Sequence, residues 1–212
     1  QRVLEPRCLP PWSTRELLDL WEGMSLALQV LHDHKPPWAH RDLKPDNVLL
    51  AEDGAPQLMD FGSLAPADVT VTSRRQAMVL QETAAERCTM PYRPPELWDV
   101  PSSAVLDART DIWALGCVFF ATLYGFSPFE CEFVAGHVRV ADCTYLRVIG
   151  RVPEPPASMR TQPPVLDDLI GRMLQQDLQA RPTVAGVIDS IARMKETCGG
   201  FADFSSLEMP PL

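Results

Sequence analysis

Apolar side chains recur at helical spacing over much of the chain, and this pattern predicts a mostly helical protein. The first helix is expected to begin at a capping box, Ser13-Thr14-Arg15-Glu16, and its apolar stripe ends near His34. The segment 111–124 is apolar almost all round, which is typical of a helix buried on every side. Two more amphipathic helices are expected over 166–176 and 183–195.

The segment 73–87 contains no glycine or proline and consists mostly of good helix formers. Ser73 is a suitable N-cap for it. Ala77, Leu80 and Ala84 share one face, and we expect Leu80 and Ala84 to meet the rest of the protein. This segment is therefore predicted to be a helix rather than a loop.

A short β-hairpin is predicted between the first two helices. Two apolar runs, 48–50 and 57–59, flank the turn signal Glu52-Asp53-Gly54. The hairpin comes directly after a polar loop, 40–47, which is too interrupted to be a core element. The predicted fold class is therefore α+β, mostly helical with one small hairpin.

Composition narrows the class of protein. The 212 residues suit one domain, and the net charge of −9 argues against nucleic-acid binding, which favours a basic face. The longest apolar stretch, 112–126, is shorter than the roughly 20 residues of a membrane span. Six cysteines without metal-ligand spacing indicate reduced thiols in a cytosolic protein. His32, His34 and His137 also lack such spacing and are expected in loops or at the surface.

The polar loop holds the residue types that phosphoryl transfer requires. That reaction needs bound Mg²⁺, a group that orients the attacking hydroxyl, and positive charge near the transferred phosphoryl. Asp42 offers a carboxylate for the hydroxyl proton, Lys44 a cation, and Asn47 an oxygen ligand for a hard metal. Across the hairpin, Asp60 is expected to fold back beside the loop as a second oxygen ligand. Gly62 leaves the backbone free to turn there.

The spacing of these residues resembles a known signature. His40-Arg41-Asp42-Leu43, with Asn47 and then Asp60-Phe61-Gly62, is similar to the catalytic signature of protein kinases. The resemblance to a eukaryotic protein kinase covers nearly all of residues 12–195. Lys44-Pro45 resembles the Ser/Thr-specific form of the loop.

The resemblance implies a role for each residue. Asp42 would be the catalytic base, Lys44 would contact the γ-phosphate of ATP, and Asn47 and Asp60 would bind Mg²⁺. Leu49 would form the floor of the adenine pocket. Supporting roles in the fold or its regulation are implied for the remaining signature residues, His40, Arg41, Phe61 and Gly62.

Further motifs follow in the order that the family has. Tyr92-Arg93-Pro94-Pro95-Glu96 resembles the end of the activation segment, and Glu96 would pair with Arg181. Asp111 begins a segment similar to the central helix of the family, where it would brace the backbone of the catalytic loop. Thr89 matches the threonine that contacts both the catalytic aspartate and the lysine. Cys88 stands before it, where the family usually has glycine.

The family's Gly-rich loop and its lysine on the third strand have no counterpart here, since no G-x-G-x-x-G occurs in the sequence. The resemblance therefore implies a kinase C-lobe with the N-lobe missing. Residues 1–11 would be a remnant of the inter-lobe region, 12–196 the C-lobe, and 197–212 a tail. Two hypotheses stay open: a fragment of an active Ser/Thr kinase, or a non-catalytic binding module built on a C-lobe.

The activation segment suggests a subgroup. It spans 36 positions from Asp60 to Glu96, which is long for the family. With its predicted helix it resembles the myristoylated and palmitoylated Ser/Thr kinases of the Numb-associated kinase group. That resemblance implies protein substrates and a cytoplasmic location. It also implies association with Golgi or other endomembranes through an N-terminal lipid signal.

Overall fold

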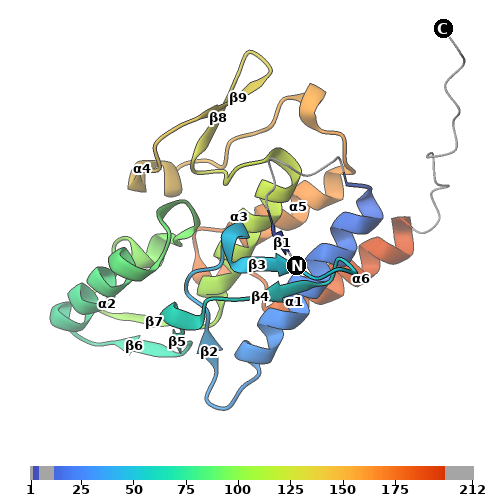
Figure 1. Cartoon of the computed structure of the whole chain (residues 1–212). Helices are drawn as coiled ribbons and strands as arrows, with labels where there is room; N and C mark the ends of the chain where they lie inside the picture. Colours follow the sequence, from blue (N-terminus) through green and yellow to red (C-terminus); the bar gives the residue numbers. More distant parts are fainter. Residues whose placement is uncertain (1, 5–11, 199–212) are drawn as a thin grey trace, which may run out of the picture.

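The computed structural model describes residues 2–4 and 12–198, and within them the helices gather around one buried helix (Figure 1). This central helix is α3 (Arg109–Tyr124), the segment that is apolar on all sides. It packs against α5 (Pro164–Met173), while α1 (Thr14–His32) packs against α6 (Val184–Cys198). The bundle therefore confirms all four helices that the hydrophobic pattern predicts.

Several helix ends differ from the sequence-based boundaries by one to three residues; α5, for example, ends at Met173 and not at Gln176. The capping box at Ser13 is present, but α1 ends at His32, and the backbone N–H of Asp33 makes the last bond, to the carbonyls of Gln29 and Leu31. Helix α6 continues through Cys198, two residues into the segment 197–212 that was expected to be a tail. The rest of that expected tail, and residues 5–11 of the expected inter-lobe remnant, lie outside the described residues.

The predicted hairpin forms and lies against α1. Strand β3 (Val48–Leu50) pairs with β4 (Pro56–Leu58), and β1 (Arg2–Val3) adds to the other edge of β3, all antiparallel. A Cβ on Gly23 of α1 would lie 2.6 Å from Cγ of Pro56. Gly23 therefore allows the hairpin to approach the helix closely, which fixes the position of the loop that precedes β3.

Helix α2 (Arg74–Arg87) is present as predicted, with Ser73 as its N-cap. Ala77 and Ala84 are buried, and Leu80 is half-buried on the same face. The helix lies to one side of the bundle, next to the strands β6 and β7 (Figure 1). The segment between the hairpin and α3 is thus ordered by local packing.

Several short elements are not evident from the sequence pattern, because each strand is only two to four residues long. Three antiparallel pairs form, and a single helical turn, α4 (Tyr145–Val148), follows the last of them. The pairs are β2 (Trp38–Ala39) with β5 (Ala65–Pro66), β6 (Val69–Val71) with β7 (Ala104–Leu106), and β8 (Cys131–Val134) with β9 (His137–Val140). Short 3-10 turns occur at Pro45–Asn47, Phe61–Ser63, Met90–Tyr92, Pro95–Leu97, Ala157–Met159 and Leu178–Ala180.

Stacked aromatic rings join the layers of the core. Trp21 of α1 stacks on Phe119 of α3 with ring centroids 4.3 Å apart, and its indole N–H donates to Oγ1 of Thr122. Trp113 of α3 stacks in the same way on Phe129. Among the described residues, no helix combines the length and apolarity that crossing a bilayer requires.

Candidate active site

Asp111, at the start of α3, holds the backbone of the polar loop. Its Oδ2 accepts the N–H of His40 at 2.7 Å, and its Oδ1 accepts the N–H of Arg41 at 2.9 Å. Arg41 adopts a left-handed backbone conformation, with φ at 69°, which these bonds help to maintain. Burial of Asp111 raises its pKa, but bonds from His32 and from the Arg41 backbone outweigh burial and lower the pKa below its usual value.

His32 corrects one sequence-based expectation. Its side chain is only 5% exposed rather than at the surface, and its Nε2 lies 3.0 Å from Oδ2 of Asp111. A signal was present in the sequence, because His32 continues the stripe formed by Trp21, Ser25 and Leu28 on the inner face of α1. His32 therefore belongs to the support of the polar loop.

Asp42, Lys44 and Thr89 form the centre of the site. Oδ1 of Asp42 accepts the backbone N–H of Thr89 at 2.8 Å, and Oδ2 lies 3.0 Å from Nζ of Lys44. The same Nζ donates to Oγ1 of Thr89 at 2.9 Å. Burial raises the pKa of Asp42, but the bonds from Thr89 and Lys44 lower it by more, so the carboxyl is held as a carboxylate.

Asn47 and Asp60 lie at the same end of the hairpin. Asn47 directly precedes β3, and its carbonyl accepts the N–H of Met59, which follows β4. Nδ2 of Asn47 donates to the carbonyl of Asp42 at 2.8 Å, so its amide oxygen faces away from that carbonyl. Asp60 has a left-handed backbone, φ 59°, and its exposed carboxylate accepts the N–H of Gly62.

His40 connects the loop to the segment after the hairpin. Its Nδ1 accepts the N–H of Asp42, and we therefore assign the proton to Nε2, which lies 3.0 Å from the carbonyl of Met59. The His40 ring also lies 5.5 Å from the ring of Phe61, measured between centroids. Nη2 of Arg41 donates to the carbonyl of Pro66, while Nη1 is buried without a hydrogen-bond partner.

The donor set suits Mg²⁺ when phosphate and water complete the coordination. Mg²⁺ is usually held by one or two protein oxygens together with substrate phosphates and water. Asn47 and Asp60 supply one amide oxygen and one carboxylate. Within the described residues, no group of three or more His, Cys, Asp or Glu side chains could hold a metal by itself. Leu49 is half-buried in β3, two positions after Asn47.

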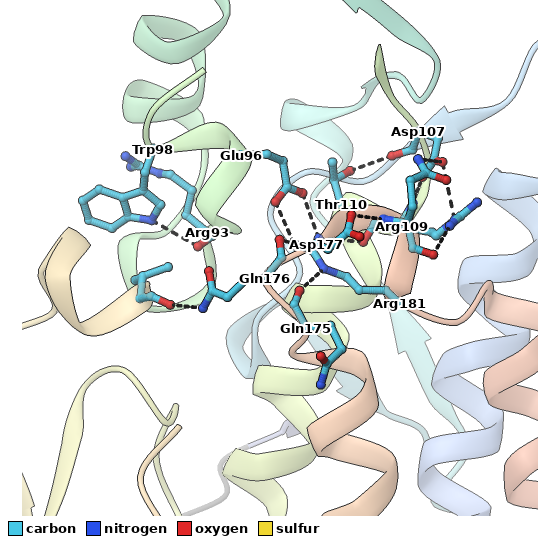
Figure 2. Close-up of polar contacts among 12 residues, drawn as sticks. Arg93, Glu96, Trp98, Asp107, Arg109, Thr110, Gln175, Gln176, Asp177 and Arg181 are labelled. Atoms are coloured by element: carbon cyan, nitrogen blue, oxygen red, sulfur yellow. Dashed lines mark hydrogen bonds and ion pairs between the residues drawn. The ribbon is translucent and has the colours of Figure 1, made fainter. Parts of the chain in front are cut away.

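The remaining expected residues lie farther along the chain. Glu96 pairs with Arg181, as Figure 2 shows, and Thr89 contacts both Asp42 and Lys44 as expected. Cys88 replaces the usual glycine without backbone strain, because its φ is −103°. It is a free, buried thiol, and burial raises its pKa to about 11.

Comparison of this sequence with known proteins finds matches to one family. A family model described as "Protein kinase domain" matches residues 4–191. The chain is 37% identical over 185 residues to "Serine/threonine-protein kinase 16" of Mus musculus, covering 87% of this chain and 58% of the relative. It is 38% identical over 173 residues to "Serine/threonine-protein kinase ENV7" of Saccharomyces cerevisiae, covering 80% of this chain and 46% of the relative. The chain thus spans about half the length of the curated relatives that it matches.

Proposed function

The chain belongs to the protein kinase domain family, and from this premise we propose that it forms the C-terminal lobe of an active Ser/Thr kinase. Such a kinase transfers the γ-phosphate of ATP to serine or threonine hydroxyls of protein substrates. Its relatives named above are Ser/Thr protein kinases, and Lys44-Pro45 is the form of the loop typical of that class.

One observation carries the proposal: the carboxylate of Asp42 is oriented by Thr89 on one oxygen and Lys44 on the other. Both bonds fix the direction of the carboxylate and keep it ionised, as a proton acceptor requires. In the reaction, the substrate hydroxyl would give its proton to Asp42 as its oxygen attacks the γ-phosphorus. Lys44, which is bonded to Thr89 and Asp42, would place positive charge beside the transferred phosphoryl.

ATP and Mg²⁺ are the expected cosubstrate and cofactor. Asn47 and Asp60 would hold the metal, and Leu49 would contact the adenine from below. Bound Mg²⁺ would neutralise phosphate charge as it develops. The Gly-rich loop that would cover the phosphates is not among the 212 residues. We propose that phosphoryl transfer takes place in a longer protein, in which an N-lobe precedes this chain.

The subgroup and the location belong to the same proposal. Helix α2 within the activation segment supports a place among the myristoylated and palmitoylated kinases of the Numb-associated group. Membership of that group would bring an N-terminal lipid signal and a position at Golgi or other endomembranes on the cytoplasmic side. The proposed partners are ATP and protein substrates, without nucleic acid, which the net charge of −9 disfavours.

An Asp42→Asn variant tests the function in the protein that carries this chain together with its N-lobe. The substitution keeps the shape of the side chain but removes the proton acceptor, so we expect kcat to fall by roughly 10²–10⁴-fold. Asp168→Asn, at an exposed position of α5, is the matched control and should keep normal turnover. Radiolabelled phosphate should appear on serine and threonine of a peptide library.

Two outcomes would contradict the proposal. Turnover of Asp42→Asn within a few-fold of wild type would remove the assigned role of Asp42. A folded wild-type protein that transfers no phosphate would instead support a non-catalytic binding module built on the same lobe.

A further inference from the structure

Arg93 has an unusual environment for a guanidinium. It is only 6% exposed, and within residues 12–198 no carboxylate lies at ion-pair distance from it. Its Nη2 donates to two carbonyls, of Ala85 at 3.2 Å and of Cys88 at 2.9 Å. Burial lowers the pKa of Arg93, and its Nε is buried without a hydrogen-bond partner. Burying a guanidinium without a counter-ion is unfavourable, which indicates that Arg93 has a role beyond packing.

The two carbonyls are at the C-terminal end of α2. This helix ends at Arg87 with Cys88 as its C-cap, and its last carbonyls have no partner within the helix. A cation there satisfies these acceptors and interacts favourably with the helix dipole. Arg93 therefore attaches the end of α2 to the segment that leads to Glu96.

The bond to Cys88 also reaches the catalytic centre through a single peptide group. The carbonyl of Cys88 and the N–H of Thr89 belong to the same planar peptide. Its carbonyl accepts from Arg93 at 2.9 Å, and its N–H donates to Oδ1 of Asp42 at 2.8 Å. Because a trans peptide directs these two groups to opposite sides, Arg93 and Asp42 hold the plane from opposite edges. A charged donor on the carbonyl also polarises the peptide and strengthens the N–H as a donor.

Trp98 in turn holds Arg93 in position. The guanidinium carbon lies 4.7 Å from the centroid of the Trp98 ring, a cation–π contact. The indole N–H of Trp98 donates to the carbonyl of Arg93 at 3.1 Å, as the dashed line in Figure 2 shows. Trp98 also stacks on Tyr145 of α4, with centroids 6.0 Å apart. Arg93 and Trp98 therefore hold each other in position.

We propose that Arg93 is a positioning residue for phosphoryl transfer, which fixes the Cys88–Thr89 peptide so that its N–H stays directed at Asp42. The inference rests on the proposed function of Asp42, although the arrangement itself can be tested without any catalysis. It assigns to Arg93 a specific task that neither helix capping nor core packing would require.

The first experiment uses amide signals of the 212-residue chain in solution. In Arg93→Met we expect the Thr89 amide proton to move upfield and to exchange with solvent about tenfold faster or more, because its bond to Asp42 weakens. Arg93→Lys keeps a buried cation but cannot reproduce the planar fork, so it should show a smaller change in the same direction. Arg160→Met removes a guanidinium bond to the carbonyl of Pro155, away from the site, and should leave Thr89 unchanged.

The result for Arg93→Lys keeps the proposal testable if Arg93→Met does not fold. Unchanged shift and exchange of the Thr89 amide in a folded Arg93 variant would overturn the proposal. A loss of thermal stability together with an unchanged Thr89 signal would show a purely structural role.

The second experiment measures kinetics in the protein that includes the N-lobe. Arg93→Met should lower kcat by about ten- to a hundredfold, because Asp42 loses its orientation, while KM for ATP stays within about twofold. Millimolar guanidinium should restore part of kcat, which a general loss of stability would not allow. A raised KM with unchanged kcat would overturn the proposal. If the wild type transfers no phosphate, only the proposed function is contradicted. The amide experiment would still test the positioning role of Arg93.

Discussion

Arg181 and Glu96 face each other through two parallel hydrogen bonds of 2.8 and 2.7 Å, although 85 positions separate them in the sequence (Figure 2). The other guanidinium donors of Arg181 bond to three backbone carbonyls, those of Arg109, Gln175 and Gln176. The Arg181 side chain is completely buried, and that of Glu96 is 11% exposed. This pair joins the end of the activation segment to the loop between α5 and α6.

Removing Arg181 should destabilise the fold strongly. Arg181→Ala would leave Glu96 almost buried without its partner, and three backbone carbonyls would each lose a charged donor. Breaking a buried pair in this way typically costs about 3–5 kcal/mol. We expect a loss of that size in the free energy of unfolding, measured by urea denaturation.

The exposed pair of Arg151 with Glu154 supplies the control for this prediction. Both side chains are more than half exposed, so Arg151→Ala should cost at most about 1 kcal/mol. If Arg181→Ala also loses less than about 1 kcal/mol, the Arg181–Glu96 pair does not stabilise the fold as proposed.

Asp111 should make stability depend on pH in the acid range. Its pKa is lowered in the folded chain, so the unfolded chain binds the proton more readily. The stabilisation is therefore complete above the unfolded pKa of about 3.9 and is lost as the pH falls through the lower folded value. At neutral pH, Asp111→Asn should cost about 1.5–3 kcal/mol, because an amide cannot accept all the bonds of the carboxylate. This difference from wild type should shrink below about pH 4.

Urea denaturation at several pH values checks this prediction, with Asp168→Asn as an exposed control on α5. The control should not change the acid dependence. A stability gap between Asp111→Asn and wild type that stays constant down to pH 3, about one unit below the unfolded pKa, would contradict the assignment.

The sequence predicts those parts of the fold whose signals are local. The capping box at Ser13, the apolar helix 111–124 and the glycine-free segment 73–87 each carry their information within a few turns of chain. The loop of Asp42 was predictable from residue types at fixed spacing. The short hairpin after it brings Asn47 and Asp60 to one end, while the loop backbone also depends on bonds to Asp111, farther along the chain.

Contacts between distant segments were harder to predict. The place of His32 beside Asp111 depends on how α1 packs against α3, 79 positions later in the chain. The bond from Arg93 to Cys88 depends on a turn that no periodic pattern marks. The β8–β9 hairpin turns at Ala135 and Gly136, both with positive φ, and its strands are too short for a clear alternation.

The 212-residue chain by itself should not bind Mg·ATP at micromolar concentrations. Asn47 and Asp60 would provide oxygen ligands and Leu49 an apolar floor, but nothing in the sequence supplies a G-x-G-x-x-G loop to cover the phosphates. Calorimetric titration of the folded chain should show no saturation at tens of micromolar ATP. Micromolar binding, together with its loss in Asp60→Asn, would show that the chain forms a complete nucleotide site.

Helix α2 should be a preformed support for the site, and breaking it should affect substrate use more than nucleotide binding. Ala84 is buried in a small apolar cluster that includes Leu97 and Leu106, so Ala84→Pro removes a helical hydrogen bond and disturbs this packing, at a cost of about 3 kcal/mol. Hydrogen exchange should show lost protection across 74–87 while α1, α3 and α6 stay protected. Ala85→Gly, at an exposed position of the same helix, should cost only about 1 kcal/mol and keep most of the protection.

In the protein with its N-lobe, Ala84→Pro should lower kcat for a protein substrate while KM for ATP stays nearly constant, because α2 ends at the Cys88–Thr89 peptide beside Asp42. Full activity of Ala84→Pro with an unprotected 74–87 segment would show that the site orders itself without α2.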